Sequence, residues 1–201
     1  MKYEWKKQEK EFYGAKKSPA LVTVPAQNYI MIGGKGNPND VDFSNRVSAL
    51  YSLAYAIKMA YKTTAIQNEF NDFTVFPLEG IWQKIEETVL VKENLGYTIM
   101  IRQPDFICED IVKAALEQVK VKKPNPLFDE ISFGTMNDGK CVEILHIGAF
   151  DDEPISFDFL HPKDSSEKCY SKATTMDFAE MCIIEFEEEL WHTKIFFHFL
   201  G

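Results

Sequence analysis

The sequence has few of the residues that build covalent or metal-linked frameworks. Only four of its 201 residues are cysteine, they are irregularly spaced, and none forms a CxxC pair. Disulfide frameworks and zinc sites are recognised by closer and more regular cysteine spacing. The four histidines form no HExxH motif or other paired ligand spacing. We therefore expect no metal, no cofactor, and buried free thiols.

Glycine-rich phosphate-binding loops are also missing. Neither GxGxxG nor GxxxxGK[ST] occurs, although Gly33, Gly34 and Gly36 surround Lys35. These motifs need fixed spacing, because their glycines let the backbone approach a phosphate. The glycines are better explained as a bend into the next helix.

Positive charge and long apolar runs are scarce. Lys and Arg number 22 against 31 Asp and Glu, a net charge of −9, whereas nucleic-acid binding needs clustered positive charge. No apolar run approaches the roughly 18 residues of a membrane-spanning helix. The charged start, residues 1–7, lacks the apolar region of a signal peptide. We expect a cytoplasmic protein that binds neither nucleic acid nor membrane.

Hydrophobic and aromatic residues are abundant, at 45% and 13% of the chain. This content is enough for a packed core, and the length suits one large domain or two small units. Sixteen Phe and eight Tyr against three Trp indicate an aromatic interior or pocket. An acidic, aromatic protein suits a neutral or cationic organic ligand, although the net charge also serves solubility.

Hydrophobic periodicity predicts strands and helices that do not alternate strictly. The expected helices cover 43–59 and a segment from Pro104 to about 123, with Cys108 on the latter's apolar face. The Asp138-Gly139 step predicts a β-hairpin. We expect strands at 21–24, 28–33, 73–78, 97–102, 131–136 and 142–148. This order favours an α+β fold.

Few residues are candidates for chemistry. Tyr51 and Tyr55 lie four apart on the predicted helix, where their rings can line one surface. Glu79 follows a predicted strand and precedes Gly80 and Trp82. A carboxylate beside large rings loses hydration, which favours general acid or base chemistry; if it stays ionised, it attracts a cation. The alternative is a solvated Glu beside a core tryptophan.

His146 lies in a predicted strand, on the face it shares with Ile144 and Gly148. That face could form the floor of a pocket. A structural histidine is the alternative.

Four segments in this order resemble the GyrI-like small-molecule-binding domain family, in its stand-alone branch. They are residues 24–39, 50–58 (LYSLAYAIK), 77–82 (PLEGIW) and 145–154 (LHIGAFDDEP). The resemblance implies a duplicated strand-helix-strand-strand module, an antiparallel sheet with helices on one face, and a ligand cleft between the modules. It covers roughly residues 1–157. Relatives include effector-binding domains of multidrug-sensing regulators, an inhibitor of DNA gyrase, and hydrolases that open cyclopropane rings of genotoxic natural products.

The chain departs from the family at two places. Ala149-Phe150 stands where this branch usually has Pro-Tyr. The late glutamate that directs water in the hydrolases is not found beyond residue 157. We therefore divide the chain into a lead-in (1–20), a GyrI-like domain (21–157), and a divergent C-terminal segment (158–201) that would be an incomplete second module.

The resemblance and the composition together predict a small-molecule-binding protein with an aromatic cleft. Its walls would be Tyr51, Tyr55, Trp82 and Phe150, with His146 and Glu79 as polar contacts. One alternative is a hydrolase of strained cyclopropane rings, for which Glu79 would be the catalytic acid or base. Another is a partner-masking protein like the gyrase inhibitor. The expected ligand is a planar or cationic hydrophobic molecule, and a homodimer is compatible with this interpretation.

Overall fold

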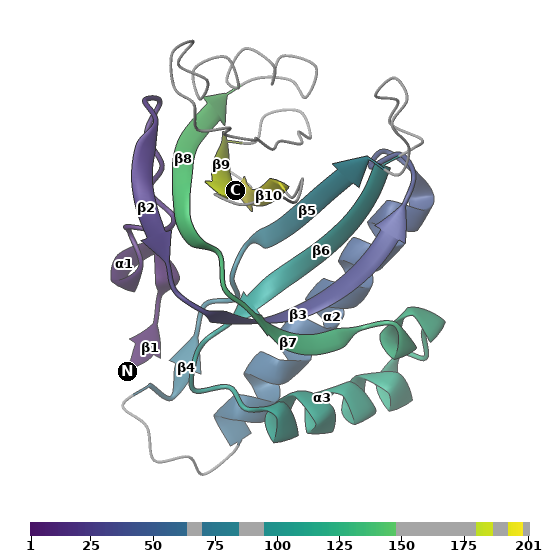
Figure 1. Cartoon of the computed structure of the whole chain (residues 1–201). Coiled ribbons are helices and arrows are strands. Elements are labelled where there is room, and N and C mark those ends of the chain that lie inside the picture. Colours follow the sequence, from purple (N-terminus) through teal and green to yellow (C-terminus); the bar gives the residue numbers. More distant parts are fainter. Residues whose placement is uncertain (64–69, 85–94, 148–179, 187–192, 199–201) are drawn as a thin grey trace.

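One antiparallel sheet of eight strands organises the protein (Figure 1). The computed structural model describes residues 1–63, 70–84, 95–147, 180–186 and 193–198, the last two ranges by their backbone alone. The strand order is β2-β8-β9-β10-β5-β6-β3-β7. The strands are β2 (Ala20–Val24), β3 (Gln27–Lys35), β5 (Leu78–Lys84), β6 (Leu95–Gln103), β7 (Ser132–Met136), β8 (Gly139–Ile147), β9 (Glu180–Phe186) and β10 (Thr193–His198).

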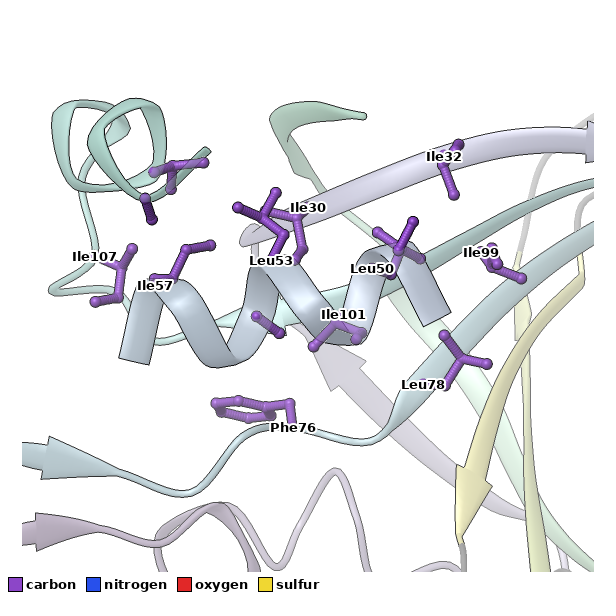
Figure 2. Packing of buried hydrophobic residues seen from close by; sticks show 14 of the residues in the cluster. Ile30, Ile32, Leu50, Leu53, Ile57, Phe76, Leu78, Ile99, Ile101 and Ile107 are labelled. Carbon is purple, nitrogen blue, oxygen red and sulfur yellow. The ribbon is translucent and has the colours of Figure 1, made fainter. Parts of the chain in front are cut away.

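Two helices form a layer on one face of this sheet. Helix α2 (Val41–Thr63) packs on β3 and β6, and α3 (Glu109–Lys122) packs on α2. Figure 2 shows Leu50, Leu53 and Ile57 of α2 beside Ile30 of β3 and Ile101 of β6, all buried. Full burial of one such side chain stabilises the fold by about 1.5–3 kcal/mol. The apolar faces of α2, β3 and β6 therefore fix the helix layer on the sheet.

The strand-helix-strand-strand order of the first module is β3-α2-β5-β6, with β6 pairing antiparallel to both β3 and β5. Strands β8, β9 and β10 also pair antiparallel, β9 lying between the other two. The segment between β8 and β9, residues 148–179, lies outside the described residues. The α+β fold with helices on one face of an antiparallel sheet is as predicted.

The predicted hairpin is wrong, although the chain does change direction at Asp138-Gly139. Strand β7 pairs with β3, whereas β8 pairs with β2 and β9. Val24 at the end of β2 pairs with Gly139 at the start of β8, and Gln27 at the start of β3 pairs with Met136 at the end of β7. The segment β2–β3 therefore runs antiparallel to the segment β7–β8, and both segments bend at the same place. Gly139 has φ +68°, which glycine adopts without strain. The bend carries the chain from one end of the sheet to the other (Figure 1).

Two other boundaries differ from expectation. The predicted strand 73–78 is interrupted: β4 covers only Asp72–Phe73, and β5 starts at Leu78. Pro77 has no N–H for a ladder, and the carbonyl of Val75 accepts a hydrogen bond from the Trp5 indole instead. Helix α3 begins at Glu109, after an extended Cys108. Cys108 is therefore exposed rather than on the apolar face, while Cys141 is buried.

The N-terminal residues pack against the rest of the molecule. Strand β1 (Lys2–Tyr3) pairs parallel with β4, and α1 (Trp5–Gln8) follows it. The Trp5 side chain is buried and belongs to the main core. A short 3-10 helix, η2 (Pro126–Asp129), precedes β7. No helix in the described part of the chain combines the length and hydropathy needed to cross a membrane.

Candidate functional site

Glu79 lies in β5 and is completely buried, with an exposed fraction of 0%. Leu78 and Trp82 of the same strand belong to the core beneath α2. Side chains alternate along a strand, so Glu79 faces the opposite side of the sheet. There it lies directly across from Met100 of β6, which is also buried. The alternative of a solvated glutamate is therefore wrong, while the role of Glu79 stays a prediction.

A tyrosine from the N-terminal segment contacts this carboxylate. The hydroxyl of Tyr13 donates a hydrogen bond to Glu79 Oε1 at 3.2 Å. Burial raises the pKa of Tyr13 well above its ordinary value, and the negative charge of Glu79 raises it further. The phenol therefore keeps its proton and remains a donor. Hydrogen bonds to an ionised acceptor are stronger than neutral ones.

A second phenol approaches Glu79 from β3. Tyr29 has an exposed fraction of 0%, and its hydroxyl lies between Glu79 and Gln27 Oε1, 2.6 Å from the latter. A phenol has one proton, so Tyr29 donates to one of these acceptors at a time. Burial, followed by the charge of Glu79, raises the pKa of Tyr29 well above its ordinary value. The site is thus a buried carboxylate between two neutral phenols.

Trp82 does not lie with Glu79. It packs among rings beneath α2, stacked on Phe43 with centroids 5.7 Å apart and tilted against Tyr97 at 5.1 Å. Trp82 and Glu79 are three residues apart in one strand, so alternation places them on opposite faces of the sheet. The structure therefore does not bring the predicted wall and the predicted carboxylate together.

Tyr51 and Tyr55 do lie together, on α2. Their ring centroids are 6.5 Å apart. Burial raises the pKa of Tyr51 to about 12, while its oxygen is hydrogen-bonded to the backbone of Leu78. Tyr55 is 56% exposed. This pair forms an aromatic surface on the helix side, separate from the Glu79 site.

The remaining predicted residues are not placed by the structure. The backbone of His146 is part of β8, but its side chain lies outside the described residues, and so does all of Phe150. Within the described ranges, no group of three or more His, Cys, Asp or Glu side chains could hold a metal ion.

Sequence reasoning missed both phenols of the Glu79 site. Tyr29 had a detectable signal, because in strand 28–33 it alternates with the buried Ile30 and therefore points to the other face. Tyr13 had none. It lies in a charged segment, and only the folded chain brings it to a residue 66 positions away.

Comparison with known proteins identifies similar structures. No family model and no curated protein matches the chain. A crystal structure of an uncharacterized conserved protein from Listeria innocua is 28% identical, covers 98% of both chains and has a TM-score of 0.76. A hydrolase from the same species is 28% identical over 97% of this chain and 98% of its own, with a TM-score of 0.73. Another L. innocua hydrolase is 27% identical over 98% of both chains, with a TM-score of 0.76.

Proposed function

We propose that this protein is a small-molecule-binding protein of the GyrI-like kind, and that Glu79 holds the positive charge of a flat organic ligand. The observation that carries the proposal is the completely buried Glu79 between the phenols of Tyr13 and Tyr29. Burying an acid is costly unless donors or a cation compensate it. Aromatic rings beside a carboxylate suit a flat cation, because they add apolar contact and cation–π attraction.

The first test uses Glu79→Gln, which removes the charge of the side chain and keeps its shape. Ethidium serves as a flat aromatic cation, and phenanthridine as its neutral parent ring system. Glu79→Gln should weaken ethidium binding at least about tenfold, because it removes a desolvated charge pair. Phenanthridine binding should change little. Fluorescence and calorimetric titration at pH 7.5 measure both affinities.

Two variants make this test specific. Glu117→Gln removes a carboxylate from α3 whose side chain is 76% exposed, and it should leave both affinities unchanged. Tyr55→Ala removes the exposed ring of the helix-side aromatic surface. If Tyr55→Ala weakens ethidium binding and Glu79→Gln does not, the ligand binds at the Tyr51–Tyr55 surface and the proposed role of Glu79 is wrong.

A hydrolase is the second candidate. Two of the similar L. innocua proteins are described as hydrolases, and the similarity extends over nearly the full length of this chain. The reaction would open a strained cyclopropane ring. Water oxygen bonds to a ring carbon, the bond from that carbon to the ring carbon conjugated with the carbonyl breaks, and its electron pair moves through the conjugated system onto the carbonyl oxygen of the substrate. Glu79 would accept a proton from the water and return it to that oxygen.

Product analysis separates the two candidates. The protein is incubated with a molar excess of a cyclopropane-bearing genotoxin. If it is a hydrolase, each protein molecule forms many molecules of a product that has gained one water. Protection of only one equivalent indicates binding alone. Glu79→Gln should slow turnover by about 10²- to 10⁴-fold, the usual contribution of a general base. A rate unchanged by this substitution excludes Glu79 as the base.

A further inference from the structure

Residues 10–19 form a strap between two fixed parts of the N-terminal region. Before the strap, Glu9 forms an ion pair with Arg102 of β6, and their side chains are 7% and 5% exposed. After the strap, β2 begins at Ala20 and pairs with β8. The strap residues are all described, and no helix or strand covers them. Segments that lack a ladder of backbone hydrogen bonds are those that open locally at low cost.

The strap crosses one face of β8. Its apolar side chains pack in the cluster that contains Cys141, which is 1% exposed. The strap residues in this cluster are Phe12, Tyr13 and Ala15. Farther along β8, the amide of Leu145 donates a hydrogen bond to the carbonyl of Lys16 at 2.7 Å. The strap therefore contacts β8 at two places, near Cys141 and at Leu145.

Glu143 lies between these two contacts. Side chains alternate along a strand, so Glu143 shares a face with Cys141 and Leu145, whereas Ile144 belongs to the main core. Glu143 is 3% exposed, and its Oε1 has no hydrogen-bond partner among the described residues. Burial raises the pKa of this carboxyl to about 7. An ionised carboxylate without a donor is costly to bury, so ionisation of Glu143 makes a closed strap less stable.

The titratable groups around Glu143 come from several elements. The strap contributes Tyr13, and β8 contributes Cys141 on the same face. The charged residues of the strap are exposed: Lys10, Glu11, Lys16 and Lys17. Strand β2 contains no titratable residue. On β9 and β10 the strand register places three titratable residues on this face, and their side chains lie outside the described residues: Glu180, Cys182 and Lys194.

We propose that the strap is a pH-sensitive cover for this face of the sheet, which closes over protonated Glu143 and opens when Glu143 ionises. The inference goes beyond the proposed function and does not depend on it, because it requires no ligand. The closed state binds the proton more tightly, so closure is lost as pH rises from about 4.5 to about 7 and levels off above. Because Tyr13 belongs to the strap, opening also withdraws its hydroxyl from Glu79.

Gly14 offers an independent way to open the strap. A Cβ built at this position would collide with the backbone carbonyl oxygen of Lys10. Glycine permits such a close approach of two backbone segments because it has no side chain. Gly14→Ala should therefore open the strap at every pH, including values at which Glu143 is protonated.

Alkylation of Cys141 measures opening, because this thiol is buried in the cluster that the strap covers. The protein is treated with N-ethylmaleimide at pH 5.5 and pH 8, and peptide mass spectrometry separates Cys141 from the other cysteines. Each rate is divided by the rate in the urea-unfolded chain at the same pH, which removes the intrinsic pH dependence of the thiol. The ratio should rise at least about tenfold between the two pH values. The charge of Glu143 itself would slow the thiol, because a nearby negative charge raises the pKa of a thiol.

Three variants make the test specific. Glu143→Gln should keep the ratio constant within about threefold, because it has no proton to lose. Glu130→Gln removes a half-exposed carboxylate from its pair with Arg46 and should keep the pH dependence of the wild type. Gly14→Ala should raise the ratio at pH 5.5 at least about tenfold, because the collision with Lys10 prevents closure.

Several results would overturn the inference. A wild-type ratio that is the same at both pH values does so, as expected if Lys194 reaches Glu143 and keeps it ionised. The same holds if a folded Gly14→Ala labels Cys141 as slowly as the wild type. Labelling at pH 8 that rises with low urea as steeply as global unfolding also overturns it, because Cys141 would then be exposed by unfolding of the whole protein. If Glu143→Gln does not fold, the wild-type pH dependence and the urea measurement decide.

Discussion

At the scale of single residues, buried acids are the feature that most needs explanation. Glu143 of β8 is only 3% exposed, and its Oε1 has no hydrogen-bond partner among the described residues. Burial raises the pKa of this carboxyl from 4.5 to about 7. Glu79 and Glu9, in contrast, have a phenol or a guanidinium beside them. Glu143 therefore destabilises the fold when it is ionised.

We predict that Glu143→Gln removes this pH-dependent cost. A folded-state pKa above the unfolded one means that the native state binds more protons between about pH 4.5 and pH 7. Stability therefore falls as pH rises through this window and levels off above it. Relative to the variant, the wild type should lose of the order of 2–3 kcal/mol of unfolding free energy between pH 4 and pH 8. Urea unfolding at both pH values measures the difference; equal pH dependence of the two proteins would contradict the raised pKa.

Residue chemistry was predictable only in part. PLEGIW identified Glu79 as a candidate, because a carboxylate between a strand and large rings is an unusual placement. The sequence could not show that Trp82 points to the other face, because that depends on where β5 begins. Two contacts were equally hidden, that of Tyr13 with Glu79 and that of Glu9 with Arg102. Tyr13 and Glu9 lie in a segment whose composition indicates only a charged lead-in.

At the scale of elements, the N-terminal segment behaves as part of the core. Its β1 pairs parallel with β4, and the buried Trp5 joins the ring cluster that contains Phe76 and Tyr13. This pairing also explains the interrupted strand at 73–78. The carbonyl of Val75 bonds the Trp5 indole rather than a neighbouring strand.

We predict that Trp5→Ala destabilises the protein by about 3–5 kcal/mol, the usual cost of removing a buried tryptophan. The loss combines a cavity in the ring cluster with an unpaired carbonyl at Val75. Lys10→Ala, which alters an exposed residue of the same segment, should stay within about 0.5 kcal/mol. Denaturant unfolding measures both. A loss below 1 kcal/mol in Trp5→Ala would mean that the segment is dispensable for the fold.

Helix α2 and strands β2, β3 and β6 were the most predictable elements. Their apolar residues recur at the helix or strand period, and each prediction lies inside the observed bounds. The hairpin prediction failed because Asp138-Gly139 carries only local information. A turn with positive φ at Gly139 can join two paired strands or bend one long segment. Pairing with β2 and β3 decides between them.

At the scale of the whole molecule, one sheet joins segments from both ends of the chain. Strand β10, near the C-terminus, pairs with β5 on one side and β9 on the other, and thereby joins β8 and β9 to the strands that lie beneath α2. The chain bends between β2 and β3 and between β7 and β8, and each bend leads from one end of the strand order to the other (Figure 1). The face opposite α2 then receives residues from β3, β5, β6 and the N-terminal segment.

The sequence by itself determined the α+β class, the helix layer and a candidate carboxylate, because periodicity and local composition are properties of neighbouring residues. Only the tertiary structure decided which face Glu79 occupies, that Tyr13 and Tyr29 lie against it, and that Glu9 holds Arg102. These contacts join residues as many as 93 positions apart. Their energy depends on burial and distance, which exist only once the sheet has formed.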